Sequence, residues 1–429
     1  MTNRRIIFTN FFSLSGLQVA NFLLPLVTLP YIVRVIGPEY FGLINFAQAF
    51  VVYFTLIVNY GFDYSATREI AVRRGKHDEI AEIVSAVLTA KLLLLAVSTV
   101  VYVLLVISIP RFQDDLLLYA YTYLFVVGAA VFPTWLFQGM EKLTRTAIFN
   151  FIIKAAFTAS IFIFIRQEGH YLYIPLINGI GHTVVGVIAL FYGLRYFRLR
   201  ISLPSKETLI AALQKGWTLF TSTVVINLYT TSNVFILGLL TANIHVGYFI
   251  AASKIIIVIQ GLLLMPMNLT LFPHIGNALH RSYEKGIEKL KRLTFLVGGI
   301  TLLASVFVFV VAKPIVFIIF GSEFGDAVTA LRMMAFLPFI IGLSNVFAIQ
   351  GLLNLKMDKV FLMITGSGAV LSIVLNLILV PRFYELGTSV SWLSTEIFIT
   401  VASFYVLFRK GINLLDFKVL RSMMFGMKL

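Results

Sequence analysis

The chain has 429 residues, of which 59% are hydrophobic and only 12% charged, and its mean hydropathy is +0.94. This balance excludes an ordinary soluble domain, and the absence of cysteine excludes disulfides and thiolate metal sites. The net charge of +15 would also suit a nucleic-acid-binding protein, so the placement of the basic residues has to be considered.

Long apolar stretches follow one another along the whole chain. A helix needs about 20 such residues to cross a hydrocarbon core about 30 Å thick. The first stretch follows Arg4 and Arg5, but it is too long for a signal peptide and lacks a small-residue cleavage site, so we expect it to stay as a helix. The pattern predicts an all-α integral membrane protein with about twelve transmembrane helices, over residues 7–33, 41–62, 82–109, 116–137, 146–165, 171–194, 217–239, 246–272, 294–319, 327–350, 360–380 and 387–408.

Lys and Arg gather in every second gap between these stretches. With the N-terminus taken as cytoplasmic, 25 of the 34 basic residues fall in cytoplasmic segments, 5 in outer segments and 4 within apolar stretches. This asymmetry predicts that both termini are cytoplasmic. Because the cations are spread over seven short segments without a basic groove, the charge does not indicate nucleic-acid binding.

Two short internal similarities suggest a duplicated architecture. The sequence FGLINFAQ at 41–48 resembles VGYFIAAS at 246–253, and QGMEKL at 138–143 resembles QGLLNL at 350–355, each pair six predicted helices apart. They predict two six-helix lobes related by a pseudo-two-fold axis along the membrane normal, with a cavity between them. The predicted parts are a first lobe at 1–194, a basic cytoplasmic linker at 195–216, a second lobe at 217–408 and an amphipathic cytoplasmic tail at 409–429 that lies on the lipid surface.

Polar side chains recur at helical spacing on several of these helices. On the second helix the stripe runs from Asn45 to Asp63, and prolines at 25, 30 and 266 predict bends on the first and eighth helices. Such stripes can hold helices together, but their occurrence at matching positions in both lobes favours a water-filled cavity. The candidate polar lining comprises Gln18, Asn21, Asn45, Gln48, Asn59 and Asn227.

The four cations within apolar stretches are Lys91, Lys154, Lys254 and Arg332. An unpaired charge at the membrane centre costs at least about 2.5–3.5 kcal/mol. Lys154 and Lys254 each lie roughly 12 Å below the surface where their helix begins, whereas Lys91 and Arg332 are placed where snorkelling is an alternative. Pairing with an acid such as Glu396 is one explanation, and a cation-lined cavity that selects an anionic substrate is the other.

Three runs in the first third of the chain resemble a known family. They are LPLVTLPYIVRVIGPEYFGLINFAQAF at 24–50, GFDYSATREIA at 61–71 and FPTWLFQGMEKL at 132–143. They look like the polysaccharide transporter branch of the multidrug/oligosaccharidyl-lipid/polysaccharide exporter superfamily, and more narrowly like the Wzx-type O-antigen flippases of bacterial inner membranes. The resemblance implies translocation of undecaprenyl-diphosphate-linked repeat units from the cytoplasmic to the periplasmic leaflet by alternating access. The residues of this chain at the motif positions are Arg34, Glu39, Asp63 and Arg68.

We therefore expect a transporter without cofactor or metal, whose partners are a lipid-linked oligosaccharide, membrane lipid, protons or sodium as coupling ion, and other glycan-assembly membrane proteins. The candidate ion-coupling acids are Glu396 and Asp63. The candidate substrate-binding cations are Lys154, Lys254, Lys91, Arg332 and Arg34.

Two alternatives from other functional classes remain. A multidrug or cation antiporter of the same superfamily would share the architecture, but cationic substrates call for buried acids, and here the bases within apolar stretches outnumber the acids. A membrane-embedded glycan polymerase or ligase would need a catalytic constellation, and the six histidines are scattered without ligand spacing. We therefore do not expect an enzyme.

Overall fold

The computed structural model describes the backbone of residues 3–419 and 421. Side chains are described over the same range except for residues 3–23, 25–26, 143, 225–226, 228–230, 265–266 and 269. The described backbone consists of helices and their connections, without a strand, which confirms the predicted all-α class. It divides into two compact units, Met1–Asn227 and Leu228–Leu429, and each is described by itself below.

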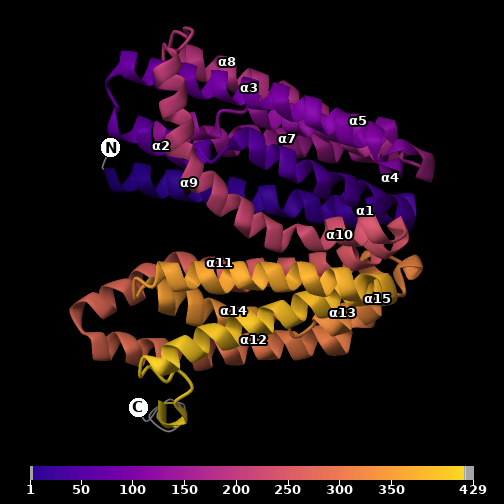
Figure 1. Ribbon diagram of the computed structural model, residues 1–429, viewed down its shortest axis with the longest axis vertical. Coiled ribbons are helices and arrows are strands. Elements are labelled where there is room, and N and C mark those ends of the chain that lie inside the picture. The colour runs from indigo at the N-terminus through magenta and orange to yellow at the C-terminus, as the bar shows by residue number, and fades with distance from the viewer. Residues whose placement is uncertain (1–2, 420, 422–429) are drawn as a thin grey trace. The chain divides into compact units, whose positions relative to one another are not determined.

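The first unit is a bundle in which α5 packs against α1, α3 and α8, and α7 packs against α1 and α8 (Figure 1). Short helices complete the connections between the long ones. Its elements are α1 (Asn3–Asn59), α2 (Phe62–Val72), α3 (His77–Ser108), α4 (Pro110–Gln113), α5 (Leu116–Val131), α6 (Thr134–Gly139), α7 (Leu143–Phe164), the 3₁₀ turn η1 (Glu168–Leu172), α8 (Tyr173–Tyr196) and α9 (Lys206–Thr230).

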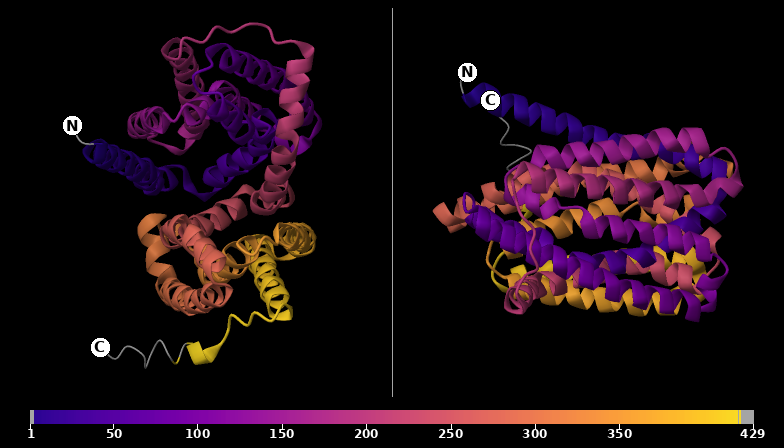
Figure 2. Two further views of the ribbon diagram at one scale, coloured as in Figure 1. Left: turned by 90° about the vertical axis from the view of Figure 1, so that its left-hand side faces the viewer. Right: turned by 90° about the horizontal axis from the view of Figure 1, so that it is seen from above.

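The second unit is a bundle in which α11 packs against α12 and α13, and α15 packs against α10, α13 and α14 (Figure 2, orange to yellow). The short π-helix η3 directly continues α14. The elements are α10 (Ser232–Leu240), α11 (Asn243–Arg281), α12 (Tyr283–Ile319), the 3₁₀ turn η2 (Ser322–Phe324), α13 (Ala327–Met334), α14 (Leu337–Ser344), η3 (Asn345–Leu353) and α15 (Asp358–Arg409).

The two longest helices each contain one sharp break. Helix α1, with 57 residues, leaves helical geometry at Gly37 (φ 68°, ψ 175°), immediately before Pro38. Helix α15, with 52 residues, does so at Tyr384 (φ 50°, ψ −126°). Both breaks fall in predicted gaps, and both helices greatly exceed the roughly 20 residues that one membrane crossing needs. Nine helices within the described residues are long and apolar enough to cross a membrane; the count of twelve crossings and the cytoplasmic termini stay predictions.

Three predicted spans are interrupted where the sequence pattern indicates continuity, and the one at 327–350 is divided between α13 and α14. The span at 116–137 ends at Val131, because Pro133 offers no backbone N–H and holds the preceding Phe132 in an extended conformation (ψ 116°). The span at 217–239 is divided at Thr231 into α9 and α10. Helix α9 begins at Lys206, so it also includes the second half of the segment predicted as a linker, and the boundary between the two units falls within it.

Apolar side chains cover the outside of the helices as well as their contacts. The hydrophobic core of the first unit includes Trp135, Leu136 and Phe137, which are fully buried. Elsewhere, Val97 on α3 is 61% exposed and Leu303 on α12 is 73% exposed. Exposed apolar surface on long helices is the arrangement expected of a protein whose solvent is lipid.

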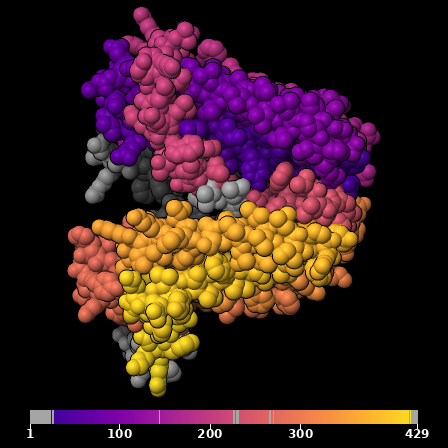
Figure 3. Space-filling model, viewed as in Figure 1, coloured from indigo at the N-terminus to yellow at the C-terminus, as the bar shows by residue number. Residues whose placement is uncertain are grey.

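The residues after α15 pack on their own unit. Ile412 and Leu414 are buried in its core, Lys291 Nζ lies 2.9 Å from Asp416 Oδ2, and the ring of Phe417 contacts Phe295. This yellow segment extends from one end of the bundle (Figure 3). Residues 412–417 are therefore held by contacts within their own unit. The position of the tail on the lipid surface stays a prediction, and its last eight residues lie outside the described part.

Candidate functional site

The two sequence motifs at 61–71 and 132–143 pack against each other in the first unit, as α2 and α6. Thr67 Oγ1 donates to the carbonyl oxygen of Trp135 at 3.2 Å, and Arg74 Nε donates to that of Gly139 at 2.8 Å. Gly139 is required there, since a Cβ would lie 2.7 Å from the Cβ of Ile70. Motifs about 70 residues apart in sequence thus form one local structure.

A cavity of about 320 Å³, here called the Asp63 pocket, opens beside this contact. Its wall combines the end of α1, the start of α2, one face of α6 and two residues of α9. The lining is Leu56, Asn59, Gly61, Asp63, Tyr64, Thr134, Gln138, Phe220 and Thr223. A carboxylate, two amides, three hydroxyls and two aromatic rings line a volume typical of ligand pockets, which is roughly 300–1,000 Å³.

The polar lining predicted from sequence is only partly assembled in this pocket. Asn59 lines it, whereas Asn45 and Asn227 donate to carbonyl oxygens of their own helices, those of Phe41 at 2.7 Å and Thr223 at 2.9 Å. Gln48 lines a separate cavity of about 180 Å³. Gln18 and Asn21 lie outside the residues whose side chains are described. Gln138 and Thr134 were missed by the sequence reasoning, although they stand in the quoted motif.

Lys91 of α3 is 1% exposed and lies in the interior of the first unit. Its Nζ donates to the carbonyl oxygen of Ala129 at 2.7 Å, in the last turn of α5. The Lys91 ammonium and the Asp63 carboxylate also attract each other electrostatically. Lys91 lines none of the pockets described here, so it does not belong to the surface of the Asp63 pocket.

The remaining candidate cations occupy different surroundings. Lys154 is half-buried on α7 and interacts electrostatically with His182 of α8, whose ring packs edge-on against Phe125. Arg34 is exposed on α1. Arg332 is exposed as well, and its guanidinium lies over the ring of Phe309, which is the arrangement expected of a snorkelling side chain.

The second unit contains a cavity of about 340 Å³, here called the Glu396 pocket. Glu396 is 4% exposed, and Lys254 is half-buried, next in sequence to the lining residue Ser253. The amide nitrogen of Gln260 is buried without a hydrogen-bond acceptor among the described residues. The lining is Asn233, Val234, Phe249, Ile250, Ser253, Ile257, Gln260, Ile341, Trp392 and Glu396. An ionisable side chain within a membrane helix costs free energy to insert, so a buried carboxyl group there is a candidate functional residue.

A buried hydrogen-bond network adjoins this pocket. Asn376 Nδ2 donates to Asn233 Oδ1 at 2.7 Å and to Ser391 Oγ at 2.8 Å, and Ser372 Oγ donates to the same Asn233 oxygen at 3.1 Å. The network ties α10 to both halves of α15. The sequence signal that points to it is the spacing of Ser372 and Asn376, which places both on one helix face.

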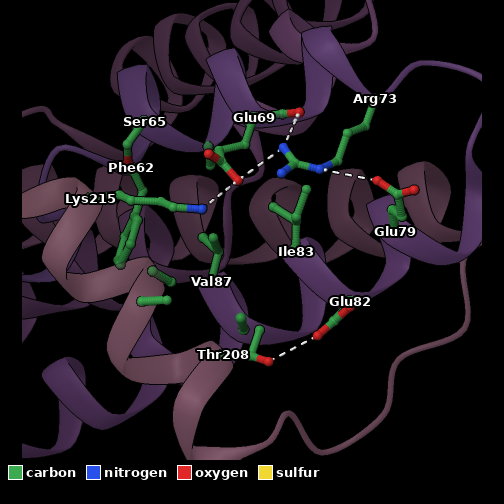
Figure 4. A pocket seen from close by; sticks show the side chains of 14 residues that line it. Phe62, Ser65, Glu69, Arg73, Glu79, Glu82, Ile83, Val87, Thr208 and Lys215 are labelled. Atoms are coloured by element: carbon green, nitrogen blue, oxygen red, sulfur yellow. Dashed lines mark hydrogen bonds and ion pairs between the residues drawn. The ribbon is translucent and has the colours of Figure 1, made fainter.

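Helix α9 is fastened to α2 and α3 around another cavity of about 340 Å³, here called the Glu69 pocket (Figure 4). Glu69 accepts from Lys215 at 2.9 Å and from Arg73 at 3.1 Å, and Glu82 accepts from Thr208 at 2.9 Å. The charges of this pocket are thus paired within the protein: Lys215 ties α9 to α2, and Arg73 also pairs with Glu79 of α3 at 3.2 Å. Within the residues that the structure describes, no group of three or more His, Asp or Glu side chains has the arrangement of a metal site.

The helical bundles, with an apolar exterior and enclosed polar pockets, define a multi-pass membrane protein of the transporter type. The sequence matches the family described as polysaccharide biosynthesis protein over residues 7–279. The chain belongs to this family, which confirms the family resemblance found in the motifs.

Two curated relatives extend over nearly the whole chain. A protein of Escherichia coli (strain K12) named "Putative O-antigen transporter" is 32% identical over 402 residues, covering 93% of this chain and 96% of its own. A protein of Shigella dysenteriae with the same name is 28% identical over 385 residues, covering 89% and 95%.

Solved structures share the fold at low sequence identity. An inward-facing MATE family multidrug transporter has a TM-score of 0.70 at 19% identity and covers 91% of this chain and 95% of its own. The lipid II flippase MurJ, in an inward closed conformation, has a TM-score of 0.72 at 14% identity and covers 96% and 90%. At these identities the likeness concerns the fold alone.

Proposed function

We propose that this protein is a flippase that moves lipid-linked oligosaccharide repeat units, of the O-antigen type, across a bacterial inner membrane by alternating access. The observation that carries the proposal is the match along almost the full length of the chain to relatives named for O-antigen transport. The polar pockets inside membrane-type helical bundles supply surfaces on which such a hydrophilic cargo can bind.

In this proposal the diphosphate of the cargo is attracted by Lys154 of α7 and Lys254 of α11. Both are half-buried within apolar helices, where a positive charge interacts more strongly with an anion than it would in water. The prenyl chain of the cargo stays in the lipid. Transport proceeds without a catalytic step, since the cargo needs only a change of leaflet.

We further propose that an ion gradient, of protons or sodium, resets the transport cycle. Glu396 and Asp63 are the two acids that the sequence offers for coupling. We favour Glu396, because its carboxyl group is 4% exposed and lines a pocket, whereas Asp63 is half-buried and is attracted by the Lys91 ammonium. A buried carboxyl group that gains and loses its charge changes the stability of its surroundings by several kcal/mol.

The test is complementation of a strain that lacks its own O-antigen flippase. Lys154→Ala and Lys254→Ala are expected to reduce surface O-antigen strongly at an unchanged amount of protein in the membrane, and Lys142→Ala, which removes an exposed lysine, serves as the matched control. Accumulation of lipid-linked repeat units inside the cell accompanies the loss. Full complementation by both variants would reject the role of the two lysines.

Drug susceptibility of the same strain tests the alternative. A cation antiporter would restore resistance to organic cations and leave O-antigen unchanged. That result would reject the flippase proposal as a whole.

A further inference from the structure

The Asp63 pocket has a distinctive chemistry for a site in a protein whose cargo carries a diphosphate. None of its nine lining residues is cationic, and one of them, Asp63, is an acid. The Lys91 ammonium, buried outside the lining, attracts that carboxylate electrostatically. The other polar groups that line the cavity are neutral: the amides of Asn59 and Gln138 and the hydroxyls of Tyr64 and of threonines 134 and 223.

The polar groups of this pocket are also available to a ligand. In the part of the chain that the structure describes, the side chains of Asn59, Asp63 and Gln138 form no hydrogen bond with the protein. Gln350, at the position that matches Gln138 in the internal repeat, is fully buried and donates to Asn268 Oδ1 at 2.9 Å. The same residue type is thus engaged internally in one unit and left facing a cavity in the other.

We propose that the Asp63 pocket is a sugar subsite: it holds an uncharged monosaccharide unit of the cargo, and the diphosphate binds elsewhere. The inference rests on the proposed function and specifies which part of the cargo this surface recognises.

Each component of the lining fits a sugar. Amide groups donate and accept, and the carboxylate of Asp63 accepts, so together they match the hydroxyl groups of a sugar ring, each of which both donates and accepts. The rings of Tyr64 and Phe220 offer apolar faces for the C–H side of the sugar. Phe220 is itself held by stacking on Tyr60, with ring centroids 4.8 Å apart and planes inclined by 14°.

Other ligand classes fit less well. A diphosphate would meet the Asp63 carboxylate without a cation in the lining to balance it, and like charges repel. An organic cation would be favoured by the carboxylate and the rings, but the Lys91 ammonium already attracts that carboxylate, and four uncharged polar side chains would gain nothing from the apolar body of the cation.

The experiment uses the full chain in lipid nanodiscs and two probes that differ only in one sugar: farnesyl diphosphate, and farnesyl diphosphate linked to a single N-acetylglucosamine. The variants are Asn59→Ala and Gln138→Ala. Asp63 is left intact, because its carboxylate also attracts Lys91. The control is Gln113→Ala, which removes an exposed amide remote in sequence from the pocket. Tetraphenylphosphonium is the organic-cation probe.

We expect the wild-type protein to bind the sugar-bearing probe at least about tenfold more tightly than the sugar-free probe. Each pocket variant should lose most of this difference, keep its affinity for farnesyl diphosphate and retain the wild-type melting temperature, while Gln113→Ala behaves as wild type. An equal loss of affinity for both probes, or no loss for either, would overturn the subsite proposal. Loss of tetraphenylphosphonium binding in the same variants, with sugar binding intact, overturns it in favour of a cation site.

The two proposals fail in different ways. If the wild-type protein binds neither prenyl diphosphate, the flippase proposal fails and the subsite fails with it. If it binds both probes but Asn59→Ala and Gln138→Ala keep the wild-type difference in affinity between them, only the subsite is wrong.

Discussion

The ammonium group of Lys91 donates a 2.7 Å hydrogen bond to the carbonyl oxygen of Ala129, 38 residues further along the chain. In an uninterrupted helix that oxygen would accept from the N–H of residue 133, which here is a proline. Lys91 therefore supplies the donor that the break between α5 and α6 removes. The positive charge also lies at the negative end of the α5 dipole.

Replacing Lys91 by Met should destabilise the protein, because the carbonyl oxygen of Ala129 would stay buried without a donor. We expect a loss of about 2 kcal/mol, measured as a lower melting temperature of the purified protein in detergent. The control is Lys154→Met on α7, where the side chain is half-buried and the loss should be smaller. Equal melting temperatures for wild type and Lys91→Met would contradict this account.

Gly61 lies where the turn after α1 meets α9. Its φ is +74°, and a Cβ would lie 2.9 Å from Leu219 Cβ and 3.0 Å from the Phe220 nitrogen. Gly61→Ala should therefore lower stability through both backbone strain and a clash, by about 2–3 kcal/mol. Gly75 shares the positive φ, at +92°, but a Cβ there meets nothing within 4 Å, so Gly75→Ala isolates the strain. A loss at Gly61 no larger than that at Gly75 would show that α9 does not pack closely on the turn.

The network around Asn376 should contribute strongly to the stability of the second unit. Asn376→Ala removes three hydrogen bonds, to Asn233 Oδ1, to Ser391 Oγ and to the carbonyl oxygen of Ser372. Since it leaves buried acceptors unsatisfied, we expect a loss of about 2–3 kcal/mol in thermal unfolding. Asn413→Ala, which removes a single exposed contact to the N–H of Leu415, should cost far less. Similar melting temperatures for the two variants would refute the network's importance.

The attachment of the C-terminal segment should depend on pH through Asp416. Hydrogen bonds from the Lys291 ammonium and from the N–H of Lys418 hold the pKa of Asp416 below its ordinary value. A lowered pKa stabilises the folded form above the ordinary carboxyl pKa of about 3.9, and this contribution is lost as the pH falls through the lowered value. The contact should thus be constant from pH 7 to about pH 5 and fail only in stronger acid.

Carboxyl NMR titration of Asp416 measures this effect directly. Lys291→Ala should move its pKa up towards the ordinary value. Arg292→Ala serves as the control, because Arg292 pairs with Glu288 instead. A midpoint unchanged by Lys291→Ala would contradict the assignment.

Local chemistry explains which features of the fold were predictable. The breaks at Gly37 and Tyr384 lie in gaps that the hydropathy pattern marks, because a turn residue and charged neighbours interrupt both apolar runs. The break at Pro133 lies inside an apolar run, where hydropathy alone does not register it. The proline is visible in the sequence, but prolines are tolerated in membrane helices when another group satisfies the freed carbonyl. Lys91, which does so, lies far away in sequence.

The candidate site was less predictable than the fold for the same reason. Helical spacing relates Asn59 to Asp63 and so predicts that both lie on one face. It carries no information about Gln138 or Thr223, which reach the pocket from helices 75 and 160 residues further on. Nor does it distinguish Asn59, which faces the cavity, from Asn45, which donates to the carbonyl oxygen of Phe41.

The π-helix η3 has a practical consequence for work on this protein. In a π-helix each N–H bonds to the carbonyl five residues back, so the segment holds one residue more than an α-helix would at the same place. Deleting one residue within Asn345–Leu353 would allow ordinary α-helical bonding, with the residues beyond the segment kept in place and side chains inside it turned to new faces. Gln350 would then lose its bond to Asn268. A single-residue deletion in this segment would change which side chains face the neighbouring helices, although the side chains themselves stay the same.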